Sequence, residues 1–191
     1  TIGPQFSADI YGMVSPGMSN VAGGIARRYA HVNGYAEGAD GAVFVAACVS
    51  EAFFEKDPVK IVEKAARLID PRSNYRQAID QVLEGHRKGV SFAELAHQTE
   101  DRWRAEYPQM NNAVANGALV AIGVLYGGGD FMKSLNVTTQ LADYADADCN
   151  AANVGAILGA MNGVRAIPEP LKAQFHDRIW GEAGFVDAFC P

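Results

Sequence analysis

The segment 113–126 is the feature that most constrains the fold of this chain, because it is apolar almost all the way round a helix. Its sequence, AVANGALVAIGVLY, has Asn116 as almost its only polar group. A helix that is apolar on every face is stable in water only when other elements cover it. The segment therefore predicts a central helix that is buried inside a shell of other helices.

Start and stop signals for further helices lie on both sides of this segment. Asp57 followed by Pro58 is a typical helix start, and Ser91 with Glu94 has the spacing of a capping box. Alternating β-branched runs are almost absent, which argues against strands. These patterns predict an all-α domain. The expected helices cover about 19–29, 41–54, 58–69, 74–88, 92–103, 113–126, a segment capped by Asp130, and 148–163, with residues 1–20 mostly in loops.

The last of these helices carries small residues at intervals of four, namely Ala151, Gly155, Gly159 and Gly163. Each glycine inside a helix costs about 0.5–1 kcal/mol relative to alanine. Several glycines in register are tolerable where they let a neighbouring helix approach closely. We therefore expect a neighbouring helix to pack against this stripe.

Composition and charge exclude several classes of protein. With 191 residues, 49% of them hydrophobic, the chain suits a single domain over residues 1–191. No apolar run reaches the roughly 18–20 residues of a membrane helix, and no signal segment opens the chain. The net charge is −6 and the basic residues are dispersed, which argues against nucleic-acid binding. Three scattered cysteines fit a reducing compartment, so we expect a cytoplasmic protein without a membrane or nucleic-acid partner.

The best candidate site is the acidic sequence that enters the last apolar helix, with Asp146 and Asp148 followed by Cys149. Inside a helix, residues two apart point in different directions, but in the turn that precedes a helix the two carboxylates can converge. Hard divalent cations such as Mg²⁺ require several oxygen ligands, and this pair supplies part of such a shell. The alternative is a structural role, in which one aspartate caps the helix and the other interacts with its dipole.

Longer stretches of the sequence resemble a known family. The sequence from Asn116 to LYGGGDF at 125–131, the run DADCNAANVGAILGAMNG at 146–163, and the following Ile167-Pro168 are similar to the C-terminal half of the ADP-ribosylglycohydrolase family. GAVFVAA at 41–47 and the helix start at Asp57 extend the resemblance. It implies a compact orthogonal bundle of helices. It also implies that residues 1–191 form the C-terminal portion of a longer domain.

The resemblance implies a metal-dependent hydrolase. Members of the family hold two Mg²⁺ ions, or sometimes Mn²⁺, and cleave the bond between ADP-ribose and a protein side chain or a related leaving group. Asp146, Asp148 and Cys149 match the motif that contributes metal ligands. Cys149 stands where the usual ligand is a hydroxyl, and sulfur is a poor partner for hard Mg²⁺. The resemblance implies an ADP-ribosylated protein as the substrate, with another N- or O-ribosyl small molecule as the alternative.

The resemblance also implies positions that contact the substrate. Asn33 and Gly34, with His31 two residues before Asn33, fall where the family contacts the ribose, just before the expected helix at 41. Gly3, Gln5 and Phe6 fall near the loop that holds adenosine and phosphate. The alternatives are that His31 only ends a helix and that Phe6 packs in the core.

The catalytic residues are not identified in this sequence. In the family, the first metal-binding motif and the catalytic carboxylate lie in the N-terminal half, for which residues 1–191 contain no match. Three explanations stay open. A separate N-terminal polypeptide completes the site, or the chain is a non-catalytic, crystallin-like pseudoenzyme or binding protein, or Thr1 is an N-terminal nucleophile.

Overall fold

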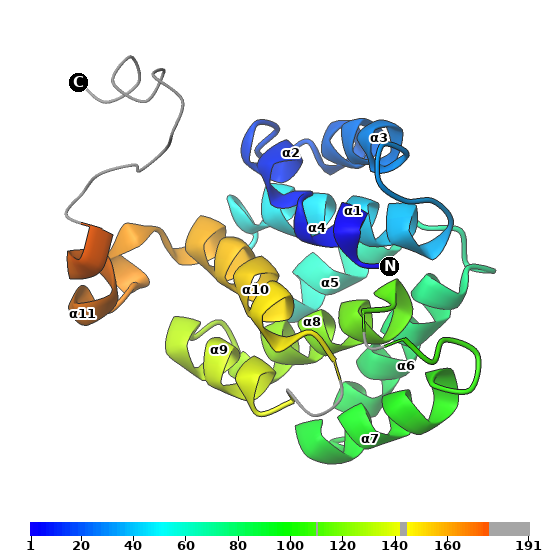
Figure 1. Cartoon of the computed structure of the whole chain (residues 1–191). Coiled ribbons are helices and arrows are strands. Elements are labelled where there is room, and N and C mark those ends of the chain that lie inside the picture. Colours follow the sequence, from blue (N-terminus) through cyan, green and yellow to red (C-terminus); the bar gives the residue numbers. More distant parts are fainter. Residues whose placement is uncertain (110, 142–144, 176–191) are drawn as a thin grey trace.

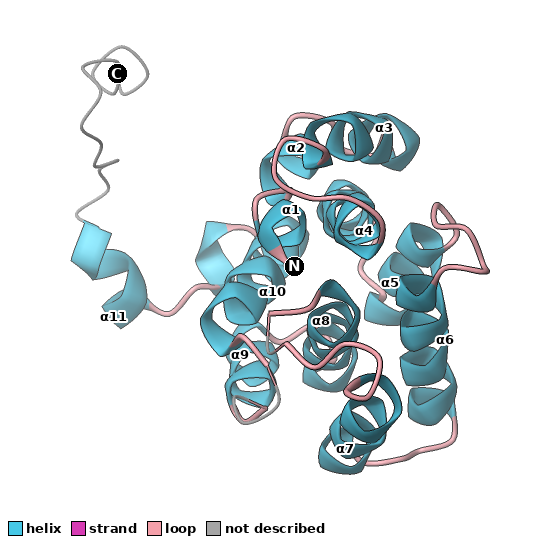
Figure 2. Cartoon of the chain, turned by 45° about the vertical axis from the view of Figure 1, so that its right-hand side comes forward, coloured by secondary structure: helices cyan, strands magenta, loops and turns pink. Residues whose placement is uncertain are grey.

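The computed structural model describes residues 1–109, 111–141 and 145–175, and this part of the chain is all-α, without a strand (Figures 1 and 2). The predicted fold class is therefore confirmed. The helices are α1 (Gly3–Phe6), α2 (Asp9–Met13), α3 (Ser19–Ala30), α4 (Glu37–Ala52), α5 (Pro58–Ala66), α6 (Asn74–Arg87), α7 (Phe92–Trp103), α8 (Ala113–Gly127), α9 (Phe131–Thr139), α10 (Ala147–Asn162) and α11 (Glu169–Lys172), with 3-10 turns at Val164–Ala166 and Ala173–Phe175.

Helix α8 is the buried centre of the molecule, as its sequence predicts. Every residue of α8 except Tyr126 is buried, and the helix contacts α4, α5, α6, α7, α9 and α10. The side chain of Asn112 caps its start by accepting a hydrogen bond from the backbone N–H of Ala115 at 2.9 Å. Gly128, with a φ of 63°, ends the helix in the left-handed conformation that favours glycine.

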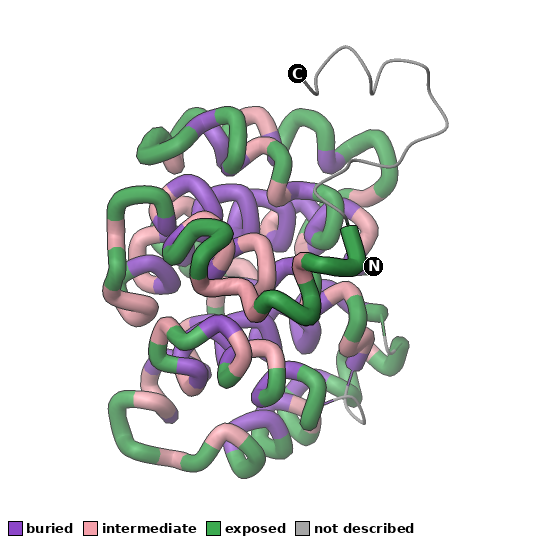
Figure 3. Tube along the Cα trace, turned by 90° about the vertical axis from the view of Figure 1, so that its left-hand side faces the viewer, coloured by how far each residue is buried: buried purple, intermediate pink, exposed green. Residues whose placement is uncertain are grey.

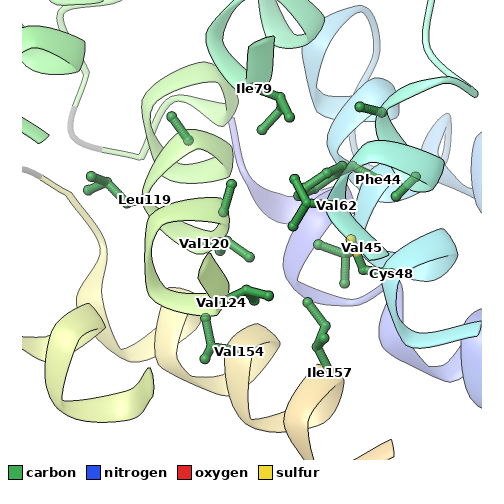
Figure 4. Packing of buried hydrophobic residues seen from close by; sticks show 14 of the residues in the cluster. Phe44, Val45, Cys48, Val62, Ile79, Leu119, Val120, Val124, Val154 and Ile157 are labelled. Atoms are coloured by element: carbon green, nitrogen blue, oxygen red, sulfur yellow. The ribbon is translucent and has the colours of Figure 1, made fainter. Parts of the chain in front are cut away.

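The hydrophobic core lies between α8, α4 and α10, and buried side chains of α5 and α6 pack against it (Figure 4). Helix α4 is the second buried element, and only its three acidic residues, Glu37, Asp40 and Glu51, keep some exposure. Figure 3 shows that the buried positions follow the inner helices, while the outer helices and turns are exposed. The side chains labelled in Figure 4 that fill this space are Phe44, Val45, Cys48, Val62, Ile79, Leu119, Val120, Val124, Val154 and Ile157.

Close packing of small residues occurs on α8 and not on the stripe predicted in α10. A Cβ atom at Gly117 would overlap the ring of Tyr75, and one at Gly123 would overlap Thr138. In α10, a Cβ atom at Gly155 would only touch Leu135 at 3.8 Å, and one at Gly159 would meet open space. The predicted close approach to the α10 stripe is therefore wrong, because that side of α10 is partly exposed.

The structure differs from the sequence predictions at two helix boundaries and in the first 20 residues. Helix α4 begins at Glu37, one turn earlier than expected, since Gly38 packs against Thr1 and Pro4, and this packing overrides the low helix propensity of the segment. Residues 1–20 contain α1 and α2, although the sequence suggested mostly loop. Helix α5 ends at Ala66, three residues before the last apolar position assigned to it.

The predicted helix starts at Asp57 and Ser91 are confirmed, whereas the side chain of Glu94, the second half of the capping box, accepts a hydrogen bond from Gln98 at 2.9 Å. The carboxylate of Asp57 accepts a hydrogen bond from the backbone N–H of Val59 at 2.9 Å, and the hydroxyl of Ser91 accepts one from that of Glu94 at 3.2 Å. Within the described residues, no helix is long and apolar enough to cross a membrane.

Two glycine substitutions test this description of the packing. Gly117→Ala should lower the free energy of unfolding by about 1–3 kcal/mol, because the added methyl group collides with the buried ring of Tyr75. Gly159→Ala is the matched control. It should raise the free energy of unfolding by about 0.5–1 kcal/mol, since the methyl group meets open space and the helix loses a flexible residue. Urea denaturation measures both changes, and equal effects would contradict the assignment of the close contact to α8.

Candidate metal centre

Three side chains with metal-binding atoms meet at the start of α10. Asp146 occupies the N-cap position, and Asp148 and Cys149 lie in the first turn. One carboxylate oxygen from each aspartate and the sulfur of Cys149 lie within 4.8 Å of one another. The backbone of Asp146, with φ −76° and ψ 84°, is not yet helical. This is why two carboxylates at positions two apart converge here, whereas inside a helix they would point apart.

The electrostatics of this cluster favour a cation. The pKa of Asp146 is raised, first by its hydrogen bond with Asp148 and then by burial and by the charge of Asp148. The pKa of Asp148 is lowered, first because it accepts that hydrogen bond and then by backbone N–H groups. Burial, followed by the two neighbouring carboxylates, raises the pKa of the Cys149 thiol. A positive ion among these atoms would offset the repulsion between the negative charges.

Asn116 connects the cluster to the buried helix α8. Its side-chain Oδ1 accepts hydrogen bonds from the backbone N–H of Asp146 at 3.0 Å and from Nδ2 of Asn150 at 2.8 Å. Its Nδ2 donates to the backbone carbonyl of Asn112 at 2.7 Å. Asn116 is completely buried, so these bonds hold the start of α10 against the core. One feature of the sequence indicates this role, since Asn116 is a lone polar residue in an otherwise apolar helix.

Buried polar groups continue from the cluster along the inner side of α10. Asn150 Oδ1 and Asn153 Oδ1 are buried and have no hydrogen-bond partner in the described residues. Asn153 Nδ2 donates to the carbonyl of Phe6 at 3.4 Å, which ties α10 to α1. An unpaired buried polar atom costs about 1–3 kcal/mol. Such groups are unusual in a core, and here they directly follow the acidic cluster in the chain.

A polar pocket of about 270 Å³ lies at the start of α8. Asn33, Gly34 and Glu37 form one side of it, and Tyr107 with the first residues of α8 forms the other. The hydroxyl of Tyr107 donates a hydrogen bond to Glu37 at 2.8 Å. Burial and the neighbouring carboxylate raise the pKa of Tyr107 to about 12. The backbone N–H groups at the N-terminus of a helix favour anionic groups such as phosphate.

Asn112 and Asn116 link this pocket to the acidic cluster. Asn112 lines the pocket, and its backbone carbonyl accepts the hydrogen bond from Asn116, which in turn binds the backbone of Asp146. Figure 1 shows the start of α10 beside α8, and the two helices are in contact. The pocket and the cluster are therefore anchored to the same end of α8.

The candidate substrate residues fall into two groups. Asn33 and Gly34 line the pocket, and a Cβ atom at Gly3 would lie 3.3 Å from Nδ2 of Asn33, which places Gly3 directly behind it. Gln5 is completely buried, and its Oε1 accepts a hydrogen bond from the hydroxyl of Tyr75 at 3.1 Å.

Phe6 and His31, like Gly3 and Gln5, lie outside the pocket lining. Phe6 is 46% exposed and is therefore not a core residue, although its carbonyl contacts α10. His31 is exposed and follows the last residue of α3, where it ends that helix. Thr1, the candidate N-terminal nucleophile, lines the pocket beside Asn33.

Comparison with known proteins decides the family. The family model described as ADP-ribosylglycohydrolase matches residues 12–189, which is nearly the whole chain. The chain belongs to the ADP-ribosylglycohydrolase family. No curated protein and no solved structure matches the chain. Membership supports a glycohydrolase, and both the acidic cluster and most of the pocket lining lie within the matched residues.

The role of Asn116 as an anchor leads to a testable prediction. Asn116→Ala should lower the free energy of unfolding by about 1–3 kcal/mol, because the backbone N–H of Asp146 and the amide of Asn150 lose their acceptor. Asn162→Ala is a matched control, since Asn162 is exposed at the opposite end of α10, where its amide donates to Gly129 at 2.8 Å. Its cost should stay within about 0.5 kcal/mol. Urea denaturation compares the two variants, and similar losses would contradict the anchoring role.

Proposed function

We propose that this member of the ADP-ribosylglycohydrolase family is a metal-dependent hydrolase of the bond between ADP-ribose and a protein side chain. The observation that carries the proposal is the convergence of Asp146 and Asp148 at the start of α10. Two carboxylates fit Mg²⁺ or Mn²⁺, which prefer oxygen ligands and keep several waters. Asp146 and Asp148 would hold the ion, as part of a two-ion site.

The bound ions would orient ribose hydroxyls, activate a water molecule and stabilise charge at the anomeric carbon. The protein supplies binding and orientation. Asn116 fixes the backbone of Asp146, and the pocket beside it accepts part of the substrate. The amide of Asn33 is placed to bind a ribose hydroxyl, and the N-terminus of α8 favours the diphosphate. We propose that the remaining ligands and the catalytic carboxylate come from outside residues 1–191, on the same chain or on a separate polypeptide.

A double variant tests the assignment of the metal ligands. Replacing Asp146 and Asp148 together by alanine should abolish binding of Mg²⁺ and Mn²⁺ measured by calorimetry, because both carboxylate ligands are lost. Asp101→Ala removes an exposed carboxylate on α7 and serves as the control, with unchanged affinity. Unchanged metal affinity in the double variant would show that the ions bind elsewhere.

Binding of free ADP-ribose tests the pocket. Asn33→Ala should weaken binding roughly tenfold, which corresponds to the loss of about one hydrogen bond. His31→Ala should leave the affinity unchanged, since His31 lies outside the pocket lining. Calorimetry compares both variants with the unchanged chain. A loss of affinity in the His31 variant alone would contradict the role of Asn33 and indicate that His31 contacts the ribose.

Release of ADP-ribose from a modified protein tests the reaction itself. We expect release when residues 1–191 are supplied together with the family's first acidic motif, on the same chain or on a second polypeptide, and loss of release in the double aspartate variant. Intact-mass analysis of the purified protein shows whether such a polypeptide accompanies the chain. Absence of release in every combination would favour the crystallin-like, non-catalytic alternative. Release of ribose derivatives only from another ribosyl compound would show that the protein is a hydrolase with a different substrate.

A further inference from the structure

Cys149 is the donor that distinguishes this cluster from a site made only of oxygen ligands. Its sulfur lies within 4.8 Å of a carboxylate oxygen of both Asp146 and Asp148. The side chain is partly exposed, so an ion from solvent can reach it. We propose that Cys149 makes this position selective for a thiophilic divalent cation, Zn²⁺ or Co²⁺, over Mg²⁺. The inference rests on the metal site proposed above and concerns which ion that site prefers.

The surroundings of Cys149 differ from those of a cysteine that only fills space. Cys48 is of that second kind, since it is completely buried in α4 and belongs to the core in Figure 4. Cys149, in contrast, lies in the first turn of α10, between Asp148 and Asn150. The amide of Asn150 is almost completely buried, shares its acceptor with the backbone N–H of Asp146, and has an unpaired Oδ1. The partly exposed Cys149 packs against the edge of the core, and its sulfur also lies beside the two carboxylates of the polar cluster.

The chemistry of the donor set determines the preference. Mg²⁺ requires near-octahedral oxygen coordination and binds sulfur poorly. Zn²⁺ and Co²⁺ accept carboxylate and thiolate ligands together, and both bind mixed sites more tightly than Mn²⁺. Coordination forms a bond between the metal and the sulfur of Cys149, and the thiol proton passes to solvent. No change of oxidation state is involved.

The experiment uses the whole chain, freed of metal and titrated with Co²⁺. Coordination by a thiolate produces a sulfur-to-cobalt charge-transfer absorption in the near ultraviolet, whereas oxygen ligands alone do not. We expect this absorption in the unchanged chain and its loss in Cys149→Ser. Calorimetry should show that Cys149→Ser weakens Zn²⁺ binding by at least about 10–100-fold and strengthens binding of Mg²⁺.

Control variants separate the possible results. Cys48→Ala and Cys190→Ala should both keep the absorption, so that its loss in Cys149→Ser identifies the ligand. Co²⁺ binding that depends on Asp146 and Asp148 but gives no charge-transfer absorption would overturn the inference and leave the proposed metal site intact. Co²⁺ binding that is unaffected by loss of both aspartates would overturn the proposed site itself. Equal affinities for Zn²⁺ in the unchanged chain and in Cys149→Ser would also overturn the inference.

Discussion

The hydrogen bonds of one buried amide hold the candidate site in place. Asn116 lies inside the apolar helix α8, yet its side chain binds the backbone of Asp146 and the amide of Asn150. A buried amide without partners costs about 1–3 kcal/mol, so the fold is more stable when α10 starts at this position than when the amide of Asn116 is left unpaired. The same bonds fix the non-helical backbone at Asp146, and this backbone lets the two carboxylates converge. The geometry of the site therefore depends on the packing of α8 against α10.

This dependence explains why so apolar a helix carries a polar residue. Helix α8 is buried on nearly all sides, and its glycines let Tyr75 and Thr138 approach its backbone. Such packing fixes the position of α8 within the domain. Because Asn116 binds Asn112 at one end of its amide and Asp146 at the other, this fixed helix sets the positions of both the pocket wall and the acidic cluster. A rigid core element thus supports residues that must keep a defined geometry.

The sequence predicted the elements that depend on local chemistry. The caps at Asp57 and Ser91, the burial of α8 and the acidic start of α10 all follow from residue type and spacing. The close packing predicted for the small-residue stripe of α10 is absent at Gly155 and Gly159, because periodicity does not show which face of a helix has a neighbour. The early start of α4 and the contacts of Asn116 depend on segments far apart in the chain. Local patterns could not reveal them, since tertiary packing sets both.

The proposed function requires that Asp146 and Asp148 hold a divalent cation at the start of α10. Anomalous X-ray diffraction from crystals soaked with Mn²⁺ tests it most directly, because the signal locates the ion without reference to activity. We expect an anomalous peak within coordination distance of a carboxylate oxygen of both Asp146 and Asp148. A peak confined to other residues, or intact density for the two carboxylates with no peak between them, would contradict it.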